Sequence, residues 1–280
     1  MLEYANIFKD RARSGSKKYY VNDFTLAEIR MFKRLQRYDY RSPFINDRYK
    51  IVTVAELIEN VLMLEKDYPR VTNSETVPGL YIELKDYVNT LDYLGYDMAV
   101  ELDKVLTTYG LNTVNKCTDK MPIIIQSFEQ EGLLKYKELS DLPLVILYSY
   151  SSPLTDWKFF GDNFHGIGPD GQWVMNHNSL VFGPTDWVKH WARDTYSPFV
   201  KKMHELGLAV HPYTLRDDVL VFRDNAFEET LLYVNNGVDG AFTEFAHSSF
   251  ELYEGFGSKS GFPTTNGPED LDTEFEWLQF

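Results

Sequence analysis

Residues 142–149 have the sequence LPLVILYS, a short apolar run that is rich in residues with a preference for strands. A run of this length and composition favours a strand buried on both faces, as strands of a parallel sheet are. Residues 121–126 (MPIIIQ) and 80–84 (LYIEL) repeat the pattern. Three further runs follow the same rule, at residues 165–169 (HGIGP), 208–214 (LAVHPYT) and 240–245 (GAFTEF). The sequence therefore predicts six buried strands.

Helix signals lie between these runs. Residues 97–109 predict a helix that ends at Gly110. Another helix is expected where Ser197 can cap the N-terminus and Pro198 takes the first helical position. Residues 225–237 (NAFEETLLYVNNG) predict a third, with Asn at its start and Gly at its end. Alternating strands and helices are typical of either a doubly wound sheet or a (β/α)8 barrel.

The first 78 residues differ from the rest of the chain. Two segments open with a Thr-x-x-Glu capping box, at Thr25/Glu28 and at Thr53/Glu56, and each predicts a helix. Residues 1–50 contain no convincing strand. At the other end, residues 255–280 are rich in Gly, Ser and Pro and then acidic, which favours a flexible tail.

The composition limits the classes of partner. The 280 residues carry a net charge of −14, which argues against general nucleic-acid binding and against an acidic membrane surface. Residues 1–50 carry 12 Lys and Arg against 6 Asp and Glu, so the remaining residues carry a net charge of −20. Cys117 is the one cysteine, and no apolar run is long enough for a membrane span. Nothing in the sequence indicates a cellular compartment.

One glycine-rich motif matches a dinucleotide-binding pattern only formally. Residues 166–171 (GIGPDG) match the Gly-x-Gly-x-x-Gly pattern of dinucleotide-binding proteins. That pattern must open a helix, and Pro169, Asp170 and the residues after them do not predict a clear one. The sequence does not favour dinucleotide binding.

Glu83 and Lys85, at the end of the strand-like run in GLYIELK (79–85), are the first candidate site residues. Alternate residues of a strand point to the same face, so the two side chains are expected side by side. One interpretation is a surface ion pair of ~0–1 kcal/mol. The other is a metal-binding carboxylate beside a phosphate-binding lysine.

Polar residues also end other predicted strands. Gln126 ends the run at 121–126, and His211 and Tyr213 lie in the run at 208–214. The carboxyl ends of parallel barrel strands form the active-site face, so His211 is either catalytic or hydrogen-bonded within a packed rim. Thr214, Thr243 and Glu244 are further residues expected at this rim.

The ordered motifs of the chain resemble a known family. GLYIELK, IIQSF, GIGPD, LGLAVHPYTLRDD and GVDGAFTEF, preceded by FKDRARSGSKKYYVNDFTLAEI, look like the landmarks of the glycerophosphodiester phosphodiesterases, over roughly residues 7–250. The resemblance implies a (β/α)8 TIM barrel with an inserted helical segment. It also implies hydrolysis of a small-molecule glycerophosphodiester to an alcohol and glycerol 3-phosphate.

The same resemblance assigns roles to individual residues. Family members use a divalent metal, Ca²⁺ or Mg²⁺, and Glu83 matches one of its three carboxylate ligands. Lys85 matches the lysine near the substrate phosphate, and Gln126, His211 and Tyr213 are expected to bind substrate in the same pocket. Oxygen ligands of this kind suit such hard cations.

The chain departs from the family in one respect. The family's acid/base pair is two histidines, in a His-Arg-Gly and a His-Asp motif, whereas the first histidine here is His165. No catalytic residue is therefore expected in this chain, and the barrel is expected to lack its first two strands. The expected domains are a truncated barrel domain at 1–254 and the tail at 255–280. The chain is then either a fragment of an active enzyme or an inactive homologue that binds phosphodiesters or a protein partner.

Overall fold

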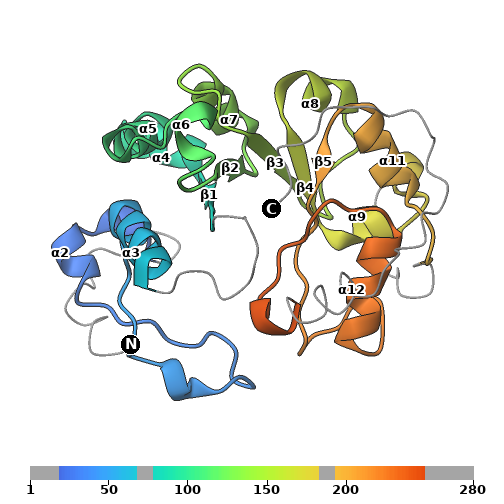
Figure 1. Cartoon of the computed structure of the whole chain (residues 1–280), viewed down its shortest axis with the longest axis horizontal. Helices are drawn as coiled ribbons and strands as arrows, with labels where there is room; N and C mark the ends of the chain where they lie inside the picture. The colour runs from blue at the N-terminus through green and yellow to red at the C-terminus, as the bar shows by residue number, and fades with distance from the viewer. Residues whose placement is uncertain (1–18, 68–77, 183–192, 250–280) are drawn as a thin grey trace. The chain divides into compact units, whose positions relative to one another are not determined.

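The computed structural model describes residues 19–67, 78–182 and 193–249 (Figure 1). The chain divides into two compact units, Met1–Asn73 and Ser74–Phe280, and each is described by itself. The predicted tail at 255–280 lies outside the described residues. Within the described ranges, no helix combines the length and the apolar character that crossing a membrane requires.

The smaller unit is helical and irregular, as its sequence predicts. Both capping boxes are formed: Thr25 and Glu28, and likewise Thr53 and Glu56, exchange side chain to backbone hydrogen bonds. Arg30 joins the two helices through an ion pair with Glu56 at 2.5 Å, and this contact above all lowers the pKa of Glu56 to about 2. The elements are η2 (Val21–Asp23), α2 (Leu26–Ile29), η3 (Pro43–Ile45) and α3 (Val54–Asp67).

The larger unit alternates strands and helices. Its strands are β1 (Leu80–Glu83), β2 (Ile123–Ser127), β3 (Leu144–Tyr148), β4 (Gly166–Pro169) and β5 (Ala209–Val210). Its helices are α4 (Tyr87–Leu94), α5 (Met98–Tyr109), α6 (Val114–Cys117), α7 (Gln130–Lys137), α8 (Trp157–Asn163), α9 (Gly171–Met175), α10 (Ser179–Phe182), α11 (Pro198–Glu205) and α12 (Ala226–Asn235).

The five strands form one parallel sheet in the order β1-β2-β3-β4-β5, in which each strand pairs with the next along the chain. A doubly wound sheet reverses its direction at a switch point, and this sheet does not. The sheet also curls, since Tyr81 on β1 contacts His211 and Phe242, which follow β5 at the other edge. Sequential order and curling together are the properties of a barrel wall.

Two of the six predicted strands differ from the sequence prediction, because one is shorter and the other forms no named strand. The run at 208–214 forms a two-residue strand, although the N–H groups of His211 and Tyr213 still donate to the carbonyls of Ile167 and Pro169 on β4. The run at 240–245 forms no named strand and makes one isolated parallel bridge, Leu215↔Thr243. The backbone still pairs there: the N–H of Phe242 donates to Pro212, and the N–H of Leu215 donates to Phe242. The predicted absence of two earlier strands is not tested and stays a prediction.

The predicted helices are present, with two local differences. Ser197 occupies the N-cap of α11, but its hydroxyl donates to the carbonyl of Val174 rather than capping the helix. The prediction of no clear helix after GIGPDG is wrong: the carboxylate of Asp170 accepts from the N–H of Gln172 and opens the short helix α9. A five-residue helix is too short for its sequence to show a periodic apolar face.

An aromatic cluster joins the sheet to three helices. Tyr148 ends β3, and its ring lies 5.2 Å from Trp157 of α8 and 5.3 Å from Trp173 of α9. Phe199 of α11 contacts both tryptophans, with centroid distances of 5.6 and 5.7 Å. These rings pack edge to face or tilted, the favoured geometries for aromatic pairs.

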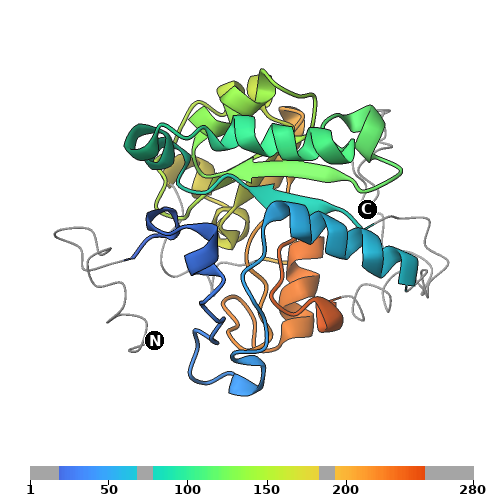
Figure 2. The ribbon, with the colours of Figure 1, turned by 90° about the vertical axis from the view of Figure 1, so that its left-hand side faces the viewer.

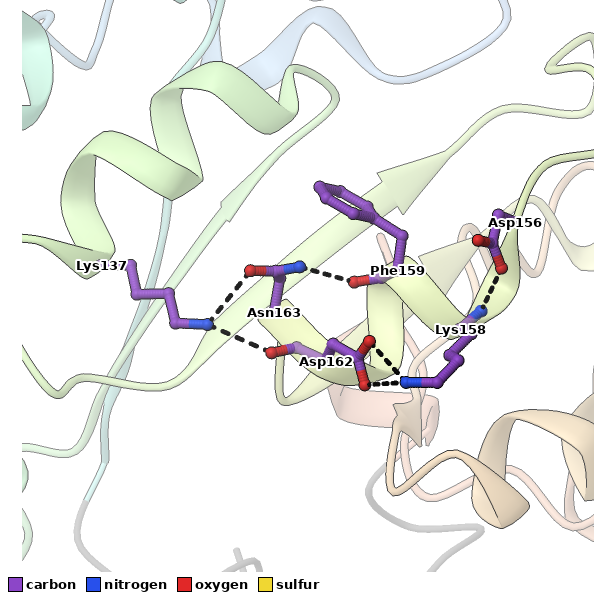
Figure 3. A network of polar contacts seen from close by, with 6 residues as sticks. All are labelled: Lys137, Asp156, Lys158, Phe159, Asp162 and Asn163. Carbon is purple, nitrogen blue, oxygen red and sulfur yellow. Dashed lines mark hydrogen bonds and ion pairs between the residues drawn. The ribbon is translucent and has the colours of Figure 1, made fainter.

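Polar contacts hold α7 against the end of α8 (Figure 3). Lys137 donates at 3.3 Å to the carbonyl of Asp162 and to the side chain of Asn163. Lys158 pairs with Asp162 one turn away, at 2.7 Å. A cation at the C-terminal end of a helix also interacts favourably with the helix dipole, so Lys137 adds a modest stabilisation at the end of α8.

A buried carboxylate organises the segment between β5 and α12. Glu229 is 2% exposed and accepts hydrogen bonds from the N–H groups of Val221, Phe222 and Arg223 at 2.8–3.1 Å. Three donors on one carboxylate oxygen form a local anchor for a segment without regular structure.

We predict that Glu229→Ala lowers the free energy of unfolding by about 3 kcal/mol or more, because three N–H groups lose their acceptor. Urea denaturation of the variant measures the effect. Glu228→Ala, at the exposed neighbouring position, is the control and should change stability by less than about 0.5 kcal/mol. Equal effects of the two substitutions would contradict this role of Glu229.

Candidate active site

Glu83 and Lys85 emerge together at the carboxyl end of β1, as predicted. Lys85 Nζ lies 3.7 Å from Glu83 Oε1, and the two side chains are 79% and 26% exposed. The separation is longer than a hydrogen bond, and an exposed pair of this kind contributes little. Glu83 Oε1 is buried and has no hydrogen-bond partner among the described residues. The ion pair alone therefore does not account for Glu83.

Gln126 lies beside Glu83 on the neighbouring strand. The two residues are register partners in the β1–β2 ladder, so their side chains leave the same face of the sheet. Gln126 is 8% exposed, and its Oε1 also is buried without a partner among the described residues. Unsatisfied buried oxygens are rare in folded proteins. The oxygens of Glu83 and Gln126 are two of five such atoms among the described residues, and these two lie on adjacent strand ends.

These oxygens fit a hard cation. Mg²⁺ and Ca²⁺ bind carboxylate and amide oxygens, which are the donor types that Glu83 and Gln126 present. In the described ranges, no group of three or more His, Cys, Asp or Glu side chains is placed to hold a metal. The chain therefore offers part of such a ligand set.

Tyr213 brings two carboxylates into the same region. It follows β5, bridges to Asp170, and its hydroxyl makes a long hydrogen bond of 3.4 Å to the carbonyl of Tyr148. Burial raises the pKa of the Tyr213 hydroxyl, and the charges of Asp170 and Glu83 raise it further. The ring of Phe128, which is 47% exposed, stacks edge-on against Tyr213 at 5.9 Å.

His211 lies on the concave side of the sheet and pairs with Tyr81. The Tyr81 hydroxyl and His211 Nδ1 are 3.1 Å apart. Burial lowers the pKa of His211 and raises that of Tyr81, while the charge of Asp239 partly offsets the effect on His211. Both groups are therefore neutral at pH 7, and the predicted substrate contact of His211 stays a prediction.

Two other predicted rim residues, Glu244 and Thr243, have structural partners. Glu244 accepts two hydrogen bonds from the guanidinium group of Arg216 at 2.9 and 3.0 Å. Thr243 accepts from the N–H of Phe245.

Sequence reasoning missed Asp170, Tyr81 and Phe128. Asp170 is the first carboxylate after the β4 run, a signal that could have been used. Burial raises the pKa of the Asp170 carboxyl. Tyr81 lies within the predicted strand at 80–84, where a tyrosine is expected to be part of the apolar core.

Two histidines with partly desolvated side chains make stability depend on pH. Burial lowers the pKa of His211 and of His165 below the ordinary value of 6.5. The unfolded chain therefore binds more protons than the folded chain as pH falls through 6.5, and stability is lost on acidification. We predict a smaller loss of stability between about pH 7 and pH 5.5 for His211→Gln than for the unchanged chain. Thermal melts across this range test it, and equal slopes in both proteins would contradict it.

Comparisons with known proteins identify the family of the chain. Residues 9–248 match the Glycerophosphoryl diester phosphodiesterase family. A glycerophosphodiester phosphodiesterase of Haemophilus influenzae is 31% identical over 300 residues, covering 91% of this chain and 75% of the relative. An Arabidopsis thaliana relative, glycerophosphodiester phosphodiesterase GDPD6, is 29% identical over 280 residues, covering 88% and 69%.

A solved structure shares the fold. The putative glycerophosphoryl diester phosphodiesterase of Silicibacter pomeroyi aligns with a TM-score of 0.57 at 16% identity, covering 86% of this chain and 71% of that one. With its sequential parallel sheet, the chain has the predicted α/β fold of barrel type. The match over residues 9–248 and the 31% identity together establish that the chain belongs to the glycerophosphoryl diester phosphodiesterase family.

Proposed function

We propose a function in the metal-dependent hydrolysis of glycerophosphodiesters to an alcohol and glycerol 3-phosphate, to which the 280 residues contribute the binding of metal and phosphodiester. The main support for this proposal is the pair of unsatisfied buried oxygens of Glu83 and Gln126 at the strand ends. The exposed ammonium group of Lys85 lies beside Glu83. Membership of the family and the names of its relatives support the reaction class.

In this proposal each residue has a distinct task. Glu83 holds the metal, and the amide oxygen of Gln126 is placed to assist. Ca²⁺ or Mg²⁺, when bound, neutralises negative charge on the phosphoryl oxygens. Lys85 is exposed and carries the positive charge that contacts the phosphate. Tyr213 keeps its proton, because its pKa is raised, and can donate a hydrogen bond to substrate.

The two histidine motifs that transfer protons in family members are absent from the sequence of this chain. Its sequence contains neither a His-Arg-Gly nor a His-Asp motif, and its first histidine is His165. Positioned acid and base groups typically supply ~10²–10⁴-fold in rate. We therefore propose that the 280 residues bind phosphodiester and metal but do not turn substrate over. This observation also favours a second candidate function, a non-catalytic homologue that acts as a phosphodiester-binding or protein-interaction module.

We predict that Glu83→Gln weakens Ca²⁺ binding by about tenfold or more, because the metal loses its charged ligand. Isothermal titration calorimetry measures this on the whole chain. Glu101→Gln removes a carboxylate that pairs with Lys104 on the surface of α5, and it is the matched control. Equal Ca²⁺ affinity in all three proteins would exclude Glu83 as a ligand.

We also predict that the chain releases no glycerol 3-phosphate from glycerophosphocholine in the presence of Ca²⁺ or Mg²⁺, because the histidine motifs are absent. A coupled enzymatic assay for glycerol 3-phosphate measures the release. Turnover that Glu83→Ala abolishes would overturn the predicted inactivity, and it would place the acid and base groups among the residues of this chain.

A further inference from the structure

Residues 33–50 of the smaller unit, here called the cationic loop, form an ordered closed loop. An antiparallel bridge between Lys33 and Lys50 joins its two ends. Inside the loop, the N–H of Gln36 donates to the side chain of Asn46 at 2.6 Å, and the N–H of Asp47 donates to the carbonyl of Arg34 at 3.0 Å. Loops of this compact type hold their own shape and are frequently functional.

The tip of the cationic loop presents apolar side chains to solvent. The tip is the short helix η3, capped by Ser42, whose hydroxyl accepts from the N–H of Phe44. Phe44 is 68% exposed and Ile45 47% exposed. Tyr40 and Tyr49, on either side of η3, are 57% and 59% exposed. An exposed cluster of large apolar side chains marks a surface that contacts a partner.

Positive charge surrounds this tip. The loop contains six Lys and Arg against two Asp, a net charge of +4, in a chain whose net charge is −14. The guanidinium group of Arg48 lies 3.8 Å from the centroid of the Phe44 ring. Charges beyond about 8 Å are largely screened at physiological salt, so the local charge of the loop decides its attraction to a charged surface more than the net charge of the chain does.

The details favour a lipid surface over a nucleic acid. A nucleic-acid site needs aromatic faces open to the bases. Here the Tyr38 ring is covered by the guanidinium groups of Arg37 and Arg41, at 4.5 and 4.7 Å, and it stacks on Tyr40. Ile45 is aliphatic and has no stacking face. Exposed Phe and Ile ringed by Tyr and Arg are suited to the boundary between headgroups and acyl chains.

We propose that the cationic loop attaches this protein to an anionic phospholipid surface, with Phe44 and Ile45 inserted and the surrounding Lys and Arg contacting the headgroups. The proposal is independent of the catalytic site, and its test needs no turnover.

The test is co-sedimentation of the whole chain with phosphatidylcholine vesicles, with and without phosphatidylserine. The chain should bind the phosphatidylserine vesicles and not the neutral ones, and high salt should weaken this binding. The double variant Phe44→Ser/Ile45→Ser should bind about tenfold more weakly, because it loses apolar burial. Arg41→Gln/Arg48→Gln, at positions on either side of η3, should also lose about tenfold, because each basic residue near an anionic surface contributes severalfold.

A matched control and a direct probe complete the experiment. Val181→Ser removes an apolar side chain that is 64% exposed on α10, and it should leave vesicle binding unchanged. Phe44→Trp should show a blue-shifted fluorescence increment on the anionic vesicles relative to the unchanged chain. Circular dichroism verifies that each variant is folded.

Three outcomes would overturn the proposal. The first is that the unchanged chain does not bind the anionic vesicles. The second is that the folded Phe44→Ser/Ile45→Ser variant binds them as tightly as the unchanged chain. The third is that the loop retains single-stranded RNA and not vesicles, which would assign it to nucleic acid.

Discussion

The candidate site depends on the parallel register between β1 and β2. Contacts at both ends of the ladder fix this register. At one end Gly79 is so close to Pro122 that a Cβ would lie 2.5 Å from its carbonyl oxygen. At the other, the hydroxyl of Ser127 donates to the carbonyl of Leu84 at 2.7 Å. A slip of one residue would turn Glu83 to the opposite face of the sheet. Glu83 and Gln126 can therefore act together only in this pairing.

Much of the fold could be predicted because its decisive signals are local. Strands buried on both faces read as continuous apolar runs, and the helices begin and end at residues such as Asp97 and Gly110, which cap α5 in the structure. The errors lie where composition alone does not decide how the backbone pairs. The run at 208–214 is a regular strand only at Ala209–Val210, and its pairing with β4 continues as an isolated bridge at Tyr213. Asp170 opens a helix within a glycine-rich stretch that showed no helical period.

The candidate site was predictable only in part. Glu83 and Gln126 could be placed because each ends a strand run, and the ends of parallel strands meet at one edge. The contact between Tyr81 and His211 could not, because it depends on the curling of the whole sheet, which brings residues 130 positions apart within 3.1 Å. Sequence patterns over short stretches carry no information about the curvature of the sheet.

Two carboxylates in the larger unit, Glu229 and Glu83, differ in how the fold compensates their buried oxygens. Glu229 gives three backbone N–H groups their acceptor, so its buried charge is compensated inside the fold. Glu83 has a buried oxygen without any such donor, and its nearest cation, on Lys85, stands 3.7 Å away and largely in solvent. An uncompensated buried oxygen costs stability, and Glu83 shares this state with Gln126 on the neighbouring strand end. The proposed cation would compensate both oxygens at once, because carboxylate and amide oxygens are ligands that Ca²⁺ and Mg²⁺ bind.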